Sequence, residues 1–283
     1  MATVKEITSK AMDELKKGDL EEYHKEFEER HDEILKIIKE AAEKEVEMEK
    51  ISARFMHKDV SGMEEEITKI IGPERLQIIK DAFLAETFTM TLEKMADDCL
   101  QIVLTKDGKQ YKETAVLSKV DSGRQQIVFQ AFSIIVEGVM LLLSVVGIKT
   151  TIDETSMKNL YSELEPVIKS SAVQEAINKF MRSWNQQGAT IWNRAKALFF
   201  LVKESYSLGL FWKIAKMCIS HMSFWEKMKA IAEITATLVA AFATDGAALI
   251  ARIILALDSA VSFIKKVSNL DNLTTREDLL ISS

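Results

Sequence analysis

Helix-breaking residues are scarce along the whole chain, and this scarcity limits the folds that it can adopt. Proline occurs only twice, at Pro73 and Pro166, and glycine only ten times in 283 residues. Sandwiches and barrels need frequent turns, whereas the abundant Ala, Leu, Glu, Lys, Met and Ile favour helices. We therefore predict an all-α multi-helix bundle, with long amphipathic N-terminal helices around a very apolar central helix and with a C-terminal apolar helical hairpin.

The chain is long enough to bury a substantial core, and we predict a single domain over residues 1–283. Three subregions follow from the composition: charged amphipathic helices over 1–121, an apolar central helix and polar linker over 122–171, and aromatic-basic helices with the apolar hairpin over 172–283. In the first subregion, the spacing predicts helices over 3–17, 19–57 and 63–71, a long helix from Pro73 to about Leu104, a turn over 105–109 and a helix over 110–121.

The segment Ile127–Ile148 is the most apolar part of the chain. Its 22 residues contain one formal charge, Glu137, and as a helix they span about 33 Å at ~1.5 Å per residue. The hydrocarbon core of a bilayer is about 30 Å thick, so the length fits a membrane span if Glu137 faces a partner helix or water. A helix that is apolar on every side is also typical of the centre of a large soluble α-domain.

Two further apolar arms occur near the C-terminus. The first ends at about Ala243, residues 244–246 predict a turn, and the second covers Ala247–Val267. These arms and the central segment supply the residues that we expect to enter a membrane, namely Ile127, Phe132, Glu137, Leu142, Ile148, Leu238, Phe242, Leu249 and Ile253.

Positive charge and aromatic residues are concentrated in residues 179–229. This window holds nine basic residues, two acidic residues and all four tryptophans, in a chain whose net charge is −6. Lys and Arg beside Trp and Phe on amphipathic helices are typical of proteins that bind the membrane interface, in particular an anionic one. Alternatively, the aromatic residues fill a core and the lysines lie at its rim. The predicted membrane-docking residues are Trp192, Lys196, Trp212, Lys213, Lys216 and Trp225.

Motifs of catalysis and cofactor binding are missing from the sequence. It contains no Gly-rich phosphate loop, no GxSxG and no HExxH, so we predict no catalytic residue, no cofactor and no enzymatic activity. His24, Glu28 and His31 have a metal-like spacing on one predicted helix, but the charged surroundings favour a solvated face, and we predict no metal site. Cys99 and Cys218 are expected to be free thiols, and the acidic balance argues against nucleic-acid binding.

The N-terminal sequence has no apolar signal segment, which predicts a cytoplasmic protein or one released without a secretory signal. The layout of the whole chain resembles that of the soluble α-helical pore-forming toxins, which shelter a hydrophobic element among long helices. We therefore expect a soluble, membrane-active protein that exposes its apolar helices at a lipid surface and acts as a homo-oligomeric pore or membrane-remodelling protein. Two alternatives stay open: a non-enzymatic scaffold or self-assembling interaction protein, and a carrier of an apolar ligand.

Overall fold

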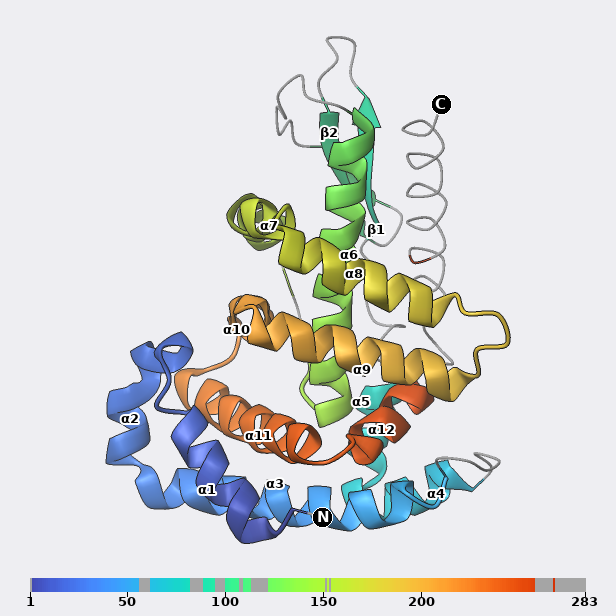
Figure 1. Cartoon of the computed structure of the whole chain (residues 1–283). Helices are drawn as coiled ribbons and strands as arrows, with labels where there is room; N and C mark the ends of the chain where they lie inside the picture. The colour runs from blue at the N-terminus through green and yellow to red at the C-terminus, as the bar shows by residue number, and fades with distance from the viewer. Residues whose placement is uncertain are drawn as a thin grey trace.

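The computed structural model describes residues 2–55, 62–81, 89–94, 100–106, 109–112, 122–150, 152, 154–257 and 267. The elements, shown in Figure 1, are α1 (Val4–Glu14), η1 (Gly18–Tyr23), α2 (His24–Glu29), α3 (His31–Ser52), α4 (Met63–Ile71), α5 (Pro73–Asp81), β1 (Thr89–Lys94), β2 (Leu100–Lys106), β3 (Lys109–Lys112), α6 (Ser122–Val146), α7 (Glu154–Ile168), α8 (Ser171–Trp184), α9 (Ile191–Ser207), α10 (Leu210–Cys218), α11 (Phe224–Ala243) and α12 (Ala247–Leu257).

The helices form a bundle around α6, which confirms the predicted multi-helix architecture. Figure 1 shows α6 upright in the middle, with α8 and α9 crossing in front of it and α1, α3 and α4 forming a layer beyond its C-terminal end. Helices α11 and α12 lie between α9 and that layer. Apolar residues recur at helical spacing in these elements, so each helix turns one face inward and the buried faces join into one core.

The sheath of the central helix differs in composition from the prediction. Helix α6 packs against α5, α7, α9, α10, α11 and α12, whereas α3 packs on α11 and α12 and α1 packs on α3 and α11. The charged N-terminal helices therefore cover α11 and α12, and the sheath of α6 comes mainly from helices later in the chain.

A small antiparallel sheet is formed by residues 89–94, 100–106 and 109–112, where the sequence predicts a helix to about Leu104, a turn over 105–109 and another helix over 110–121. The strands lie in the order β1-β2-β3, and Lys106 at the end of β2 pairs with Lys109 at the start of β3. Thr, Ile and Val in β1 and β2 favour strands because their branched side chains suit the pleated surface. The predicted helix from Pro73 is therefore wrong over Thr89–Lys94 and from Leu100 to Leu104, and the helix predicted over 110–121 is wrong over 110–112. The rest of both predictions beyond Asp81, over 82–88, 95–99 and 113–121, lies outside the described residues.

Three other boundaries differ from the predictions. The helix expected over 19–57 is split into η1, α2 and α3, with a non-helical Arg30 (φ −114°, ψ 29°) before α3. The expected polar linker contains α7, and Pro166 lies inside that helix. The C-terminal hairpin is a corner, because the chain bends by 113° between α11 and α12, and Gly246 takes a positive φ of 70° there. Beyond Leu257 the second predicted arm lies outside the described residues, except for Val267.

Candidate functional site

Helix α6 contains the membrane-length segment of the described chain. Residues Ile127–Val146 pass a test of length and composition for a span, with a mean hydropathy of 2.1, and 78% of the apolar window is buried inside the protein. Helices α11 and α12 pass the same test only as one bent pair. In this conformation α6 is a core helix, and contact with lipid would require the surrounding helices to move.

The residues predicted to enter a membrane lie in the core or at its edge. Glu137 and Phe242 are half-buried. The others are buried, with at most 9% of their surface exposed: Ile127, Phe132, Leu142, Ile148, Leu238, Leu249 and Ile253.

The C-terminal end of α6 is held by two arginines from other helices. The last four carbonyl groups of a helix have no partner within it and must find one elsewhere. Here the Leu143 and Ser144 carbonyls accept from the amides of Ile148 and Gly147, as in a Schellman motif with Gly147 at positive φ. The next two carbonyls accept from arginine side chains: Val145 from Arg252 Nη1 at 3.3 Å and Val146 from Arg75 Nη1 at 3.4 Å.

Arg252 belongs to a buried polar cluster, which we define as Glu45, Thr237 and Arg252. Arg252 Nη2 donates to Glu45 Oε2 at 2.6 Å and to Oε1 at 2.7 Å, and the two side chains are only 4% and 6% exposed. Thr237 Oγ1 also donates to Glu45 Oε1, at 3.2 Å. The cluster therefore ties α3 to α11, to α12 and, through Val145, to the end of α6.

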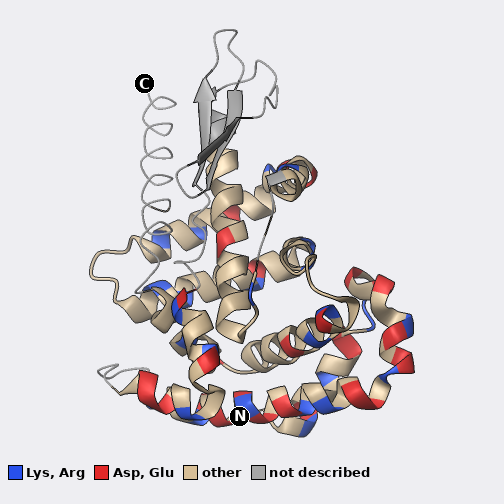
Figure 2. Ribbon diagram, turned by 180° about the vertical axis from the view of Figure 1, so that it is seen from behind, with Lys and Arg blue, Asp and Glu red and all other residues tan. Residues whose placement is uncertain are grey.

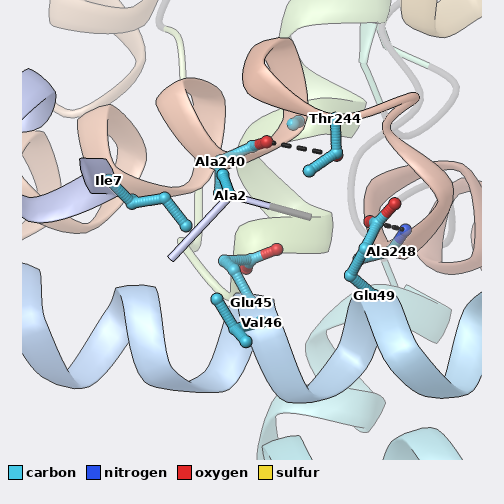
Figure 3. A pocket seen from close by; sticks show the side chains of 9 residues that line it. Ala2, Ile7, Glu45, Val46, Glu49, Ala240, Thr244 and Ala248 are labelled. Atoms are coloured by element: carbon cyan, nitrogen blue, oxygen red, sulfur yellow. Dashed lines mark hydrogen bonds between the residues drawn. The ribbon is translucent and has the colours of Figure 1, made fainter. Parts of the chain in front are cut away.

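Glu49 adds a second connection one turn further along α3. Its carboxylate accepts from the amide of Ala248 at 3.0 Å and so caps the N-terminus of α12, where a negative charge is favourable. Figure 3 shows Glu45 and Glu49 rising from α3 toward α11 and α12, around a narrow cavity of about 10 Å³ that Ala2 and Thr244 also line.

Arg75 forms the matching but more open connection on α5. Its Nη2 donates to both carboxylate oxygens of Glu233 on α11, at 3.0 and 3.1 Å, and the side chains are 34% and 26% exposed. Two arginine–carboxylate pairs thus anchor the same helix end, and only the pair with Arg252 is removed from water.

A basic aromatic stripe runs along α9, and we call Trp192, Lys196, Phe200 and Lys203 the α9 face. Lys196 and Phe200 are exposed, whereas Trp192 and Lys203 are half-buried. Their spacing of four, four and three residues places them on one side of a helix. Phe200 is 41% exposed, and Lys196 lies over its ring at 5.9 Å. Lys203 lies over the ring of Phe242 at 5.5 Å, so the stripe continues to the corner between α11 and α12.

The other predicted docking residues lie away from the α9 face. Trp212 is a core residue, 3% exposed and in edge contact with Phe211, so in this conformation it is not available for the membrane docking predicted for it. Lys213 pairs with Glu163 at 2.7 Å, and Lys216 lies 3.4 Å from Glu22.

Trp225 belongs to another corner of the molecule, at the start of α11. It is half-buried, with Arg30 over its ring at 4.5 Å and Lys229 at 5.1 Å. Neighbouring Phe224 is 49% exposed and contacts the ring of Tyr23 at 6.0 Å. Of the six predicted docking residues, only Trp192 and Lys196 share the α9 face.

The metal-like spacing of His24, Glu28 and His31 does not lie on one helix, because the non-helical Arg30 separates α2 from α3. No group of three or more potential ligands that could hold a metal ion occurs among the described residues. Cys218 is a free, buried thiol, and burial raises its pKa above the ordinary value; Cys99 lies outside the described residues.

The buried cluster could not be predicted from sequence spacing, because Glu45 and Arg252 are 207 positions apart. One signal was present: Arg252 is the only basic residue between Ala247 and Leu257, and a charge on an apolar helix needs a partner. Phe200 and Lys203 could have been found from their helical spacing to Lys196.

Comparison with known proteins finds no matching family, no matching curated protein and no matching solved structure.

Proposed function

We propose that this chain is a membrane-active helical protein that shelters apolar helices in its core and transfers them to a lipid bilayer. The supporting observation is the state of α6: a segment of membrane length and composition, closed off by helices that are themselves joined through polar contacts. Twenty residues of helix measure about 30 Å, which equals the hydrocarbon thickness of a bilayer.

Helix α3, which covers α11 and α12, has a composition that would let it leave the bundle. Helix α3 combines a buried apolar stripe with an opposite face of Glu and Lys, so it keeps a favourable surface in water after leaving the core. The contacts that hold it include Glu45 to Arg252 and Glu49 to Ala248. Because α12 also contacts α6, departure of α3 would loosen both apolar elements. In the inserted, oligomeric state, the charged face of α3 would line a water-filled interior.

Transfer of α6 can be followed directly with a fluorescent label on its half-buried side. Met140, in the C-terminal third of α6, is half-buried and accepts substitution with less disturbance than the fully buried positions. On a background with Cys99→Ser and Cys218→Ala, Met140→Cys carries an environment-sensitive dye. With anionic vesicles we expect blue-shifted emission, quenching by nitroxide-labelled lipid, and release of a dye trapped in the vesicles.

The matched control carries the same dye on α3 at Glu43→Cys, an exposed position. Its emission is expected to stay that of a dye in water while the vesicles leak. Leakage absent at every lipid composition, with the Met140→Cys dye unquenched, would contradict the proposal. A discrete oligomer in light scattering without any vesicle binding would favour the scaffold instead.

A further inference from the structure

The α9 face carries chemistry that the burial of α6 does not explain. Phe200 and Phe224 are the two large hydrophobic side chains exposed on the described part of the chain, and Phe200 lies between two lysines of one helix. A single exposed phenylalanine is common, but Phe200 shares its helix side with two lysines and Trp192, and this composition suits a partner that is both apolar and anionic.

Helices α8 and α9 carry more basic than acidic residues, whereas the N-terminal helices carry more acidic residues. The hairpin of α8 and α9 (171–207) holds Lys179, Arg182, Arg194, Lys196 and Lys203 against Glu175 and Glu204. Figure 2 shows many acidic residues on the N-terminal helices, which lie on the side of α11 that faces away from α9. The molecule therefore presents a basic side and an acidic side, which would orient it at a negatively charged surface.

We propose that the α9 face is the site at which this protein docks on a bilayer of anionic phospholipid. Lys196 and Lys203 meet the lipid phosphates and carboxylates, the amphipathic indole of Trp192 enters the headgroup layer, and the apolar Phe200 ring reaches the boundary with the acyl chains. The inference rests on the proposed membrane activity and adds the surface and the lipid class to it.

The position of Phe242 connects docking with insertion. Its ring lies under Lys203 on α9 and in contact with Phe199, and four residues later Gly246 packs so tightly that an added Cβ would lie 2.7 Å from the Phe199 ring. The corner between α11 and α12 is therefore immediately beside the α9 face. Docking through α9 brings this corner, rather than the acidic N-terminal layer, to the lipid.

The test is sedimentation of the full chain with large vesicles of equimolar phosphatidylcholine and phosphatidylserine, or of phosphatidylcholine alone. Removing one cation from a membrane contact lowers binding by about fivefold, so Lys196→Gln with Lys203→Gln should lower the partition coefficient about 25-fold. Phe200→Ser should lower it about tenfold. We expect weak binding of every form to the uncharged vesicles.

Matched controls change the same properties on other surfaces. Lys36→Gln with Lys39→Gln alters the net charge equally on exposed positions of α3, and Phe224→Ser removes the other exposed phenylalanine. Both should bind the anionic vesicles as the unchanged chain does. If the α3 and α9 double variants lose binding equally, or if neither loses it, the assignment to α9 is overturned.

The outcomes distinguish an error in the docking surface from an error in the proposed transfer of α6. If the α9 variants bind and release trapped dye as the unchanged chain does, the α9 face is wrong and the membrane activity stands. If the chain binds through Lys196 and Lys203 but the Met140→Cys dye never meets lipid, the surface stands and the transfer of α6 is wrong. A chain that binds no vesicle refutes both.

Discussion

Substitution of Glu45 by glutamine tests the buried cluster most directly. Glu45→Gln keeps the size of the side chain but removes the negative charge that Arg252 needs, since both groups are almost inaccessible to water. Removing one partner from a buried ion pair costs about 3–5 kcal/mol, because the remaining charge has no compensation. For a chain of this size, about 2–4 °C per kcal/mol gives a fall in Tm of about 10 °C.

The decisive comparison is the double variant Glu45→Met with Arg252→Met. Replacing both members of a buried pair with apolar residues is often neutral or stabilising. Here the Val145 carbonyl also loses its arginine partner, which costs about 1–3 kcal/mol. We therefore expect the double variant to be within about 2 kcal/mol of the unchanged chain, far from the sum of its two single variants.

The assay is thermal and urea unfolding followed by helical circular dichroism. Glu65→Gln is the matched control, because it breaks an ion pair with Lys69 in which both side chains are largely exposed, and it should leave the unfolding midpoint unchanged. A loss below about 1 kcal/mol for Glu45→Gln, or strictly additive single variants, would refute the view that this pair is buried and coupled.

Two further predictions concern the backbone corner and a buried phenol. Gly246→Ala should destabilise by about 2 kcal/mol in urea unfolding, because its φ is +70° and its Cβ would meet the Phe199 ring, whereas Gly18→Ala has open space and should be neutral. Burial, followed by the charge of Glu22, raises the pKa of Tyr23 to about 12. The contribution of the neutral Tyr23 side chain to the free energy of unfolding is therefore fully present below pH 10 and is lost as the pH rises toward 12. Urea unfolding over this pH range measures the loss, and an equal fall in the stability of Tyr23→Phe would contradict the prediction.

Local sequence determined where many of the helices of this protein lie and which of them are apolar. The run Ile127–Ile148 became the core of α6, and the break at residues 244–246 separates α11 from α12, because hydrophobic spacing and glycine act within a few residues. The same local logic failed over 89–112. There, the turn over 105–109 was predicted, but the helix-favouring composition outweighed the strand signal of the Thr-, Val- and Ile-rich segments beside it.

Tertiary structure alone decided which groups meet. Sequence spacing could place Trp192 and Lys196 on one side of α9, but only packing buried Trp212 and brought Phe242 beneath Lys203. The pairing of Glu45 with Arg252 likewise depends on where α3 crosses α12, which no local pattern records. The physical reason is that helix formation follows interactions three or four residues apart, whereas a buried charge finds its partner only when distant segments pack together.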